Sequence, residues 1–158
     1  MHTRTLILSA TLLLSMGTAR AEDCLSPADI EAEQAIRFKT ELMVVSELCR
    51  DGSYMSFLQR NADTVRRYQK QMIEAFNRSG NRNSVDAFDS FETKLANEAM
   101  LRHGRVPTEV LCLEKQNFLR SSGNLDADAF RRYSIVLAEQ NLPSYKTCRP
   151  AQSVRGRP

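Results

Sequence analysis

Apolar side chains recur at steps of three and four residues in five successive segments after residue 26. This spacing places them on one face of an α-helix, and no segment shows the alternation of a strand. The predicted stripes are Phe38/Leu42/Val45/Cys49, Tyr54/Phe57/Leu58/Val65/Tyr68/Met72/Ala75/Phe76, Val85/Phe88/Phe91/Leu95, Val110/Leu111/Leu113/Phe118/Leu119 and Phe130/Tyr133/Val136/Leu137.

Capping and stop residues separate these stripes. The predicted boundaries are Ser26-Pro27, Asp51-Gly52, Ser79-Gly80, Ser84 as a cap, His103-Gly104, Pro107-Thr108, Ser121-Ser122-Gly123, Asp126 as a cap and Asn141-Leu142-Pro143. Only a few residues connect one helix to the next, which favours antiparallel neighbours. We therefore expect an all-α, up-down bundle of four or five helices.

The first 21 residues have the three parts of a secretory signal peptide. Arg4 gives a short basic start, Thr5 to Met16 is apolar, and Ala19-Arg20-Ala21 matches a small-residue cleavage pattern. This apolar stretch is shorter than a membrane-spanning helix, and nothing after Ala21 reaches that length. The sequence predicts a periplasmic or secreted protein with no transmembrane segment after cleavage.

The remaining chain is long enough for one domain. We assign 1–21 to the signal peptide, 22–148 to the helical domain and 149–158 to a disordered basic tail. The whole chain has 22 basic and 19 acidic side chains. Two of the basic ones, Arg4 and Arg20, leave with the leader, so the mature net charge is near +1. Such a weak charge argues against nucleic acid as a partner.

Four cysteines, Cys24, Cys49, Cys112 and Cys148, lie in the exported part, an even number that is typical of two disulfides. Cys24 and Cys49 flank one long helix, which would hold them about 30 Å apart, too far for a bond. In an up-down bundle, Cys49 and Cys112 share one end. An extended stretch over 142–147 could return Cys148 to Cys24. The predicted bonds are Cys49–Cys112 and Cys24–Cys148, with a structural role.

The sequence contains no motif for catalysis, for metal binding or for cofactor binding. We therefore predict no catalytic residue, no metal ligand and no cofactor. His103 is the only histidine after cleavage. Its place at a helix C-terminus favours interaction with the helix dipole over catalysis. The loop 122–128 has part of a calcium-site pattern but lacks the carboxylates of its first half, so a helix cap is the better interpretation.

Positive charge is concentrated on the second predicted helix, at Arg60, Arg66, Arg67 and Lys70. A solvated surface explains these residues, with Asp63 able to pair with Arg66 or Arg67 at helical spacing. An anionic partner is the alternative. The aromatic residues of the same helix are interpreted as core.

These observations favour a non-enzymatic interaction protein of the cell envelope, such as an accessory subunit, inhibitor or chaperone-like module, whose partner is another envelope protein. That hypothesis predicts an exposed apolar or charged patch on one face of the first two helices. The alternative is a carrier that binds a small molecule in the bundle core. An enzyme is the third and weakest hypothesis.

Overall fold

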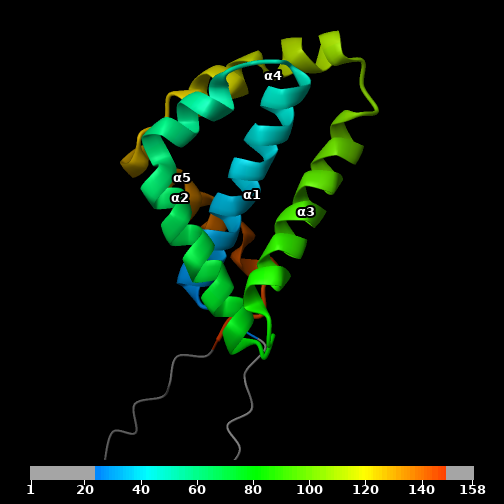
Figure 1. Ribbon diagram of the computed structural model, residues 1–158. Helices are drawn as coiled ribbons and strands as arrows, with labels where there is room; N and C mark the ends of the chain where they lie inside the picture. The colour runs from blue at the N-terminus through cyan, green and yellow to red at the C-terminus, as the bar shows by residue number, and fades with distance from the viewer. Residues whose placement is uncertain (1–23, 149–158) are drawn as a thin grey trace, which may run out of the picture.

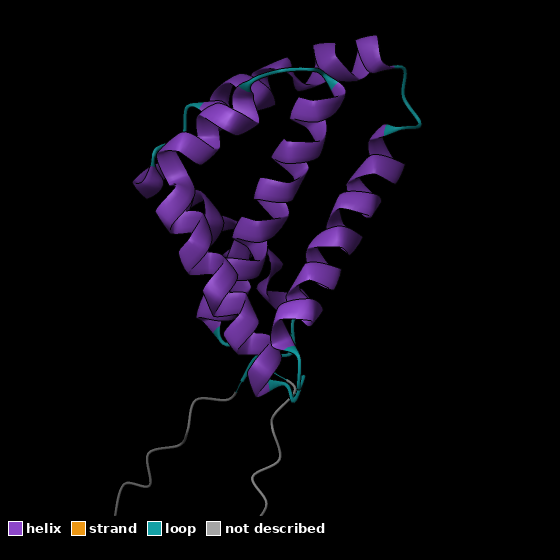
Figure 2. Cartoon of the chain, in the orientation of Figure 1, coloured by secondary structure: helices purple, strands orange, loops and turns teal. Residues whose placement is uncertain are grey.

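The computed structural model describes residues 24–148, which form a bundle of α-helices and one short 3₁₀ turn. The elements are α1 (Pro27–Leu48), α2 (Ser53–Arg78), α3 (Ser84–His103), α4 (Thr108–Gly123), α5 (Ala127–Asn141) and η1 (Leu142–Ser144). Figure 2 shows that short loops join these helices. The predicted all-α bundle is confirmed, whereas the predicted leader 1–21 and tail 149–158 lie outside the described residues.

α1 is the central helix of the bundle. It packs against α2, α3, α4 and α5, and most of its side chains are buried. α2 returns antiparallel to α1, α3 runs back beside them, and α4 lies across the end of the bundle where α1 finishes (Figure 1). None of the helices within residues 24–148 combines the length and apolarity needed to cross a bilayer.

The interaction hypothesis predicted an exposed apolar or charged patch on one face of the first two helices. Most side chains of α1 are buried, and the charged side chains of α2, such as Arg66 and Lys70, are exposed. Apart from Met55 on α2, the large exposed apolar side chains lie beyond α2, mainly on α3, α4 and α5.

Aromatic rings fill the centre of the bundle. Phe38 of α1, Phe57 of α2 and Phe130 of α5 are buried and in mutual contact, with ring centroids 4.9 to 5.8 Å apart. Tyr68 adds an edge-on contact to Phe130. Such edge-to-face pairs are favourable beyond the area that they bury. The expectation that the aromatic residues of α2 belong to the core is confirmed.

Side-chain caps fix three helix starts. The Ser26 hydroxyl accepts a hydrogen bond from the backbone N–H of Asp29, and the Asp126 carboxylate accepts one from that of Ala129, as predicted. α3 differs from the prediction. Its cap is Asn83, whose side chain accepts from the backbone of Asp86, and Ser84 is already helical. Adjacent residues that both cap well leave such a boundary ambiguous by one position.

Both predicted disulfides are confirmed. The Cα atoms of Cys49 and Cys112 are 5.5 Å apart, and those of Cys24 and Cys148 are 4.9 Å apart. The chain reaches Cys148 differently from the extended path predicted over 142–147. Leu142–Ser144 forms a 3₁₀ turn first, and the fixed φ of Pro143 is compatible with this turn.

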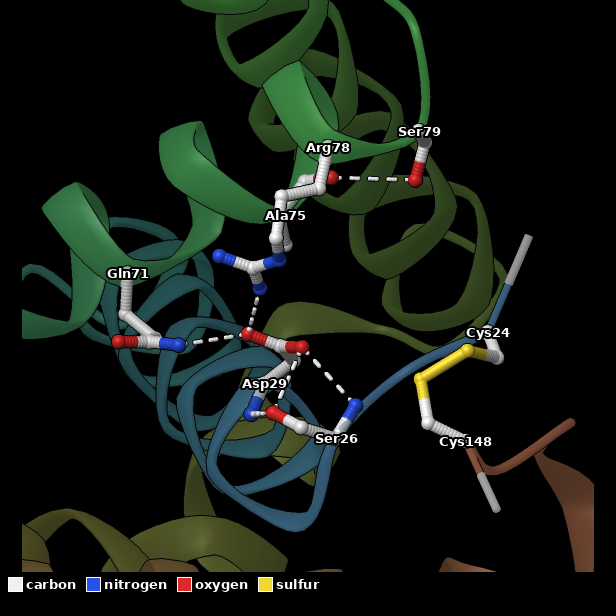
Figure 3. A network of polar contacts seen from close by, with 8 residues as sticks. All are labelled: Cys24, Ser26, Asp29, Gln71, Ala75, Arg78, Ser79 and Cys148. Atoms are coloured by element: carbon white, nitrogen blue, oxygen red, sulfur yellow. Dashed lines mark hydrogen bonds and ion pairs between the residues drawn. A yellow bond between two sulfur atoms is a disulfide. The ribbon is translucent and has the colours of Figure 1, made fainter. Parts of the chain in front are cut away.

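Buried Asp29 connects the start of α1 to the end of α2 (Figure 3). One carboxylate oxygen accepts hydrogen bonds from the backbone N–H and hydroxyl of Ser26, at 2.9 and 2.7 Å. The other accepts from Gln71 and Arg78, both at 2.6 Å. Burial raises the pKa of Asp29, but the hydrogen bonds from Ser26, Arg78 and Gln71 more than offset this effect and leave the pKa below its ordinary value. The same network lies beside the Cys24–Cys148 bond.

Candidate functional site

A surface groove runs between α3 and α5, with α1 as its floor. α3 and α5 both pack against α1, and residues of α1 line the groove between them. The groove has a volume of about 330 Å³, and it is lined by Gln34, Arg37, Phe38, Glu41, Leu95, Glu98, Ala99, Arg102, Phe118, Tyr133 and Leu137. We call it the α1/α3/α5 groove.

Aromatic side chains form the inner part of this groove. Phe38 contacts Tyr133 edge-on, with ring centroids 5.1 Å apart, and contacts Phe118 of α4 at 5.9 Å. Phe38 is buried, Phe118 is half-buried and Tyr133 is 41% exposed. Apolar surface that remains in contact with water has a free-energy cost, which burial against a partner recovers. The groove therefore has the character of a pocket for an apolar side chain.

Charged side chains form the edge of the groove. Arg37 donates from Nε and Nη2 to one oxygen of Glu33, at 2.8 and 2.6 Å, and its guanidinium lies 5.7 Å from the ring centre of Phe91. At the end nearest the Cys24–Cys148 bond, the Gln34 amide donates to the hydroxyl of Tyr145 at 2.6 Å. These contacts hold the polar edge in place around the apolar floor.

Glu41 of α1 binds two residues at the C-terminal end of α3. Its Oε2 accepts a hydrogen bond from Arg102 Nη2 at 2.6 Å, and its Oε1 lies 2.6 Å from Nε2 of His103. Burial raises the pKa of Glu41, but the hydrogen bonds from His103 and Arg102 outweigh burial, and the pKa is lower than its ordinary value. These two contacts join α3, one side of the groove, to α1, its floor.

The structure places His103 where the sequence predicted, as the last residue of α3, and shows that it is buried. The sequence gave no signal for its partner, because Glu41 is 62 residues away and no spacing rule connects them. A carboxylate–imidazole pair resembles half of a catalytic triad, which also needs a nucleophile. Within residues 24–148, the imidazole has no hydrogen bond to a hydroxyl or thiol group. In the same range, no three His, Cys, Asp or Glu side chains are placed to hold a metal ion.

The four predicted site cysteines lie in the two disulfides, away from the groove lining. Cys49 and Cys112 line a separate hollow of about 550 Å³, whose other side chains are mostly polar, such as Ser53, Gln116 and Arg120. Polar walls keep their hydration and gain less from an apolar partner than the floor of the groove does. For this reason the larger hollow is the weaker candidate for a protein-binding site.

The basic side chains of α2 have local partners. Arg60 donates to the carbonyl of Gly123, Arg66 pairs with Asp63, and Arg67 lies over the ring of Tyr68. The predicted pairing of Asp63 is thereby confirmed.

Comparison of the chain with protein-family models, with curated proteins and with solved structures finds no match.

Proposed function

We propose that the protein is a non-enzymatic interaction module of the cell envelope, an accessory subunit, inhibitor or chaperone-like protein, that binds another envelope protein through the α1/α3/α5 groove. The observation that carries this proposal is the aromatic cluster of buried Phe38 with the partly exposed rings of Phe118 and Tyr133, inside a charged edge. Buried apolar anchors surrounded by a polar rim are the common anatomy of protein interfaces.

The size of the groove agrees with this type of binding. A volume of about 330 Å³ is sufficient for one or two large side chains of a partner and is at the lower limit for a site that encloses a small molecule. The alternative function, a carrier with a ligand in the bundle core, has less support. Phe57 and Phe130, both fully buried, occupy the centre of the core.

Export to the periplasm or the exterior is part of the same proposal. Two disulfides are typical of proteins outside the reducing cytosol, and the leader pattern at 1–21 fits cleavage after Ala21. Intact-mass spectrometry of the protein purified from its own envelope tests this part. We expect a chain that begins at Glu22 and has no free thiols; a chain that retains residues 1–21, or contains four thiols, would contradict export.

Site-specific cross-linking in intact cells tests the groove. A photo-reactive phenylalanine analogue at Tyr133, in the groove, should give one discrete cross-linked species with another protein. The matched position is Val136, on the same helix, 46% exposed and outside the groove lining. We expect no such species from Val136.

A charge in the groove should then abolish the cross-link. With the probe moved to Leu137 in the groove lining, Tyr133→Glu should weaken binding at least tenfold, because a buried apolar anchor contributes about 1.5 to 3 kcal/mol. Val136→Glu is the control and should leave the cross-link unchanged. Equal cross-linking from both positions, or equal loss in both variants, would refute the groove as the binding site.

A further inference from the structure

A second hollow is lined by the start of α1, the middle of α2 and the first turns of α5. We call it the α1/α2/α5 hollow. Its volume is about 480 Å³, which is within the usual range for sites that hold a small molecule. None of its lining residues belongs to the α1/α3/α5 groove. The two sites are therefore separate.

Four charged side chains line this hollow, two acidic and two basic. They are Glu31 of α1, Arg67 of α2, and Asp128 and Arg131 of α5. Within residues 24–148, none of the four belongs to an ion pair. Arg67 has only a ring contact, with its guanidinium 5.7 Å from the ring centre of Tyr68. Opposite charges thus line one hollow without touching one another.

Tyr68 holds the carboxylate of Glu31 in place. The tyrosine side chain is buried, and its hydroxyl donates a hydrogen bond to Glu31 Oε1 at 2.7 Å. Burial and this hydrogen bond raise the pKa of Tyr68, so the hydroxyl remains a donor at neutral pH. The other carboxylate oxygen of Glu31 has no hydrogen-bond partner among the described residues. Glu31 is therefore a positioned anion with one oxygen available to a ligand.

The hydroxyl of Thr64 adds an unpartnered polar group. Thr64 is only 5% exposed, and within residues 24–148 its side chain makes no hydrogen bond. Thr40 Oγ1 and Asn61 Oδ1 are the unpartnered side-chain atoms of that range that are sealed from solvent, and the Thr64 hydroxyl is not one of them. Because Thr64 lines the hollow, its hydroxyl opens into it. A nearly buried hydroxyl without a partner has a free-energy cost, which a hydrogen-bonding ligand recovers.

We propose that the α1/α2/α5 hollow binds a short peptide of about two or three residues through its charged ammonium and carboxylate ends. The ammonium group pairs with the acidic side chains of the wall, and the carboxylate pairs with the basic ones. Two wall carboxylates disfavour a simple anion, and two guanidinium groups disfavour a simple cation. A ligand that carries both charges is complementary to all four side chains.

NMR titration of the purified protein with alanyl-alanine tests the proposal. We expect shifts of backbone amides around the hollow and a Kd at or below about 2 mM. N-acetyl-alanyl-alanine lacks the ammonium group, and alanyl-alanine amide lacks the carboxylate, so each should bind at least tenfold more weakly. A blocked peptide that binds as tightly as alanyl-alanine, or no binding of alanyl-alanine at about 20 mM, would overturn the proposal.

Substitutions in the wall test the location of the site. Glu31→Gln and Arg131→Gln should each weaken binding at least fivefold, because each removes one charge that the ligand needs. Thr64→Val, which keeps the shape and removes the hydroxyl, should weaken it at least threefold. The matched control is Arg132→Gln on α5, also exposed but outside the lining, and it should bind like the wild type. Circular dichroism checks that each variant retains its helix content. Equal affinities of Arg131→Gln and Arg132→Gln would show that the peptide does not bind in this hollow.

Discussion

Asp29 is a buried carboxylate whose four hydrogen bonds join the start of α1 to α2. Its bonds to Ser26 satisfy the backbone N–H and the hydroxyl of the capping residue of α1, and its contact with Arg78 reaches the last residue of α2. An isolated buried charge would be costly, but here the ionised form is fully hydrogen-bonded. The residue therefore stabilises the bundle only while it is ionised.

Asp29→Asn should lower the free energy of unfolding by about 1 to 3 kcal/mol, because the amide retains the shape but loses the ion pair with Arg78. Urea denaturation at neutral pH measures this difference. Asp63→Asn is the matched control: its exposed pair with Arg66 should contribute no more than about 0.5 kcal/mol. Equal losses in the two variants would contradict the special role of Asp29.

The same substitution should change how stability depends on pH. The pKa of Asp29 is lowered from 3.8 in the folded protein, so the folded state favours the ionised form. Its contribution is complete well above that unfolded-state value and is lost as the pH falls through the lower folded-state pKa. Wild-type stability should thus fall below about pH 4 more steeply than that of Asp29→Asn. If the stabilities of the wild type and of Asp29→Asn fell in parallel as the pH is lowered, ionised Asp29 would not be the source of this pH dependence.

At the scale of elements, the two disulfides fasten opposite ends of the bundle. Cys49–Cys112 connects the end of α1 to α4, and Cys24–Cys148 joins the start of the domain to its last described residue. The chain segments that they close span 63 and 124 residues. Long closed segments restrict the unfolded chain strongly.

Replacing both cysteines of either pair by serine should lower the free energy of unfolding by up to about 4 to 5 kcal/mol in the chain-entropy model. The helices should persist, because the aromatic core at Phe38, Phe57 and Phe130 is independent of the sulfur atoms. Thermal unfolding followed by circular dichroism measures both effects. A double-serine variant as stable as the wild type would show that its bond is dispensable for the fold.

Most of the element boundaries were predictable because they depend on local chemistry. Helical spacing, Ser26-Pro27 and Asp126 specify where helices start, and the short loops determine which helix ends meet, which was enough to pair the cysteines. The α3 cap was misplaced by one residue because Asn83 and Ser84 are both good caps. The turn at Leu142–Ser144 was missed because an extended path and a 3₁₀ turn both bring the chain back to Cys24.

At the scale of the whole molecule, the groove was not predictable from the sequence. Its lining comes from four helices, and the pattern of α1 alone does not show which helices pack on either side of it. The sequence placed Phe38 in a core stripe correctly, yet the same ring also lies at the floor of the groove. Pairing of Glu41 with His103 likewise depends on tertiary packing, and no local rule specifies it.

The bond between Cys24 and Cys148 also determines how the domain responds to mechanical force. Leu25 and Thr147 are bridged beside it, so the two ends of the domain lie together at one pole (Figure 1). Tension applied between residue 24 and residue 148 passes through the sulfur–sulfur bond and leaves the helices unloaded. A protein anchored or pulled by its ends would therefore keep its helical bundle and its groove intact until that bond is reduced.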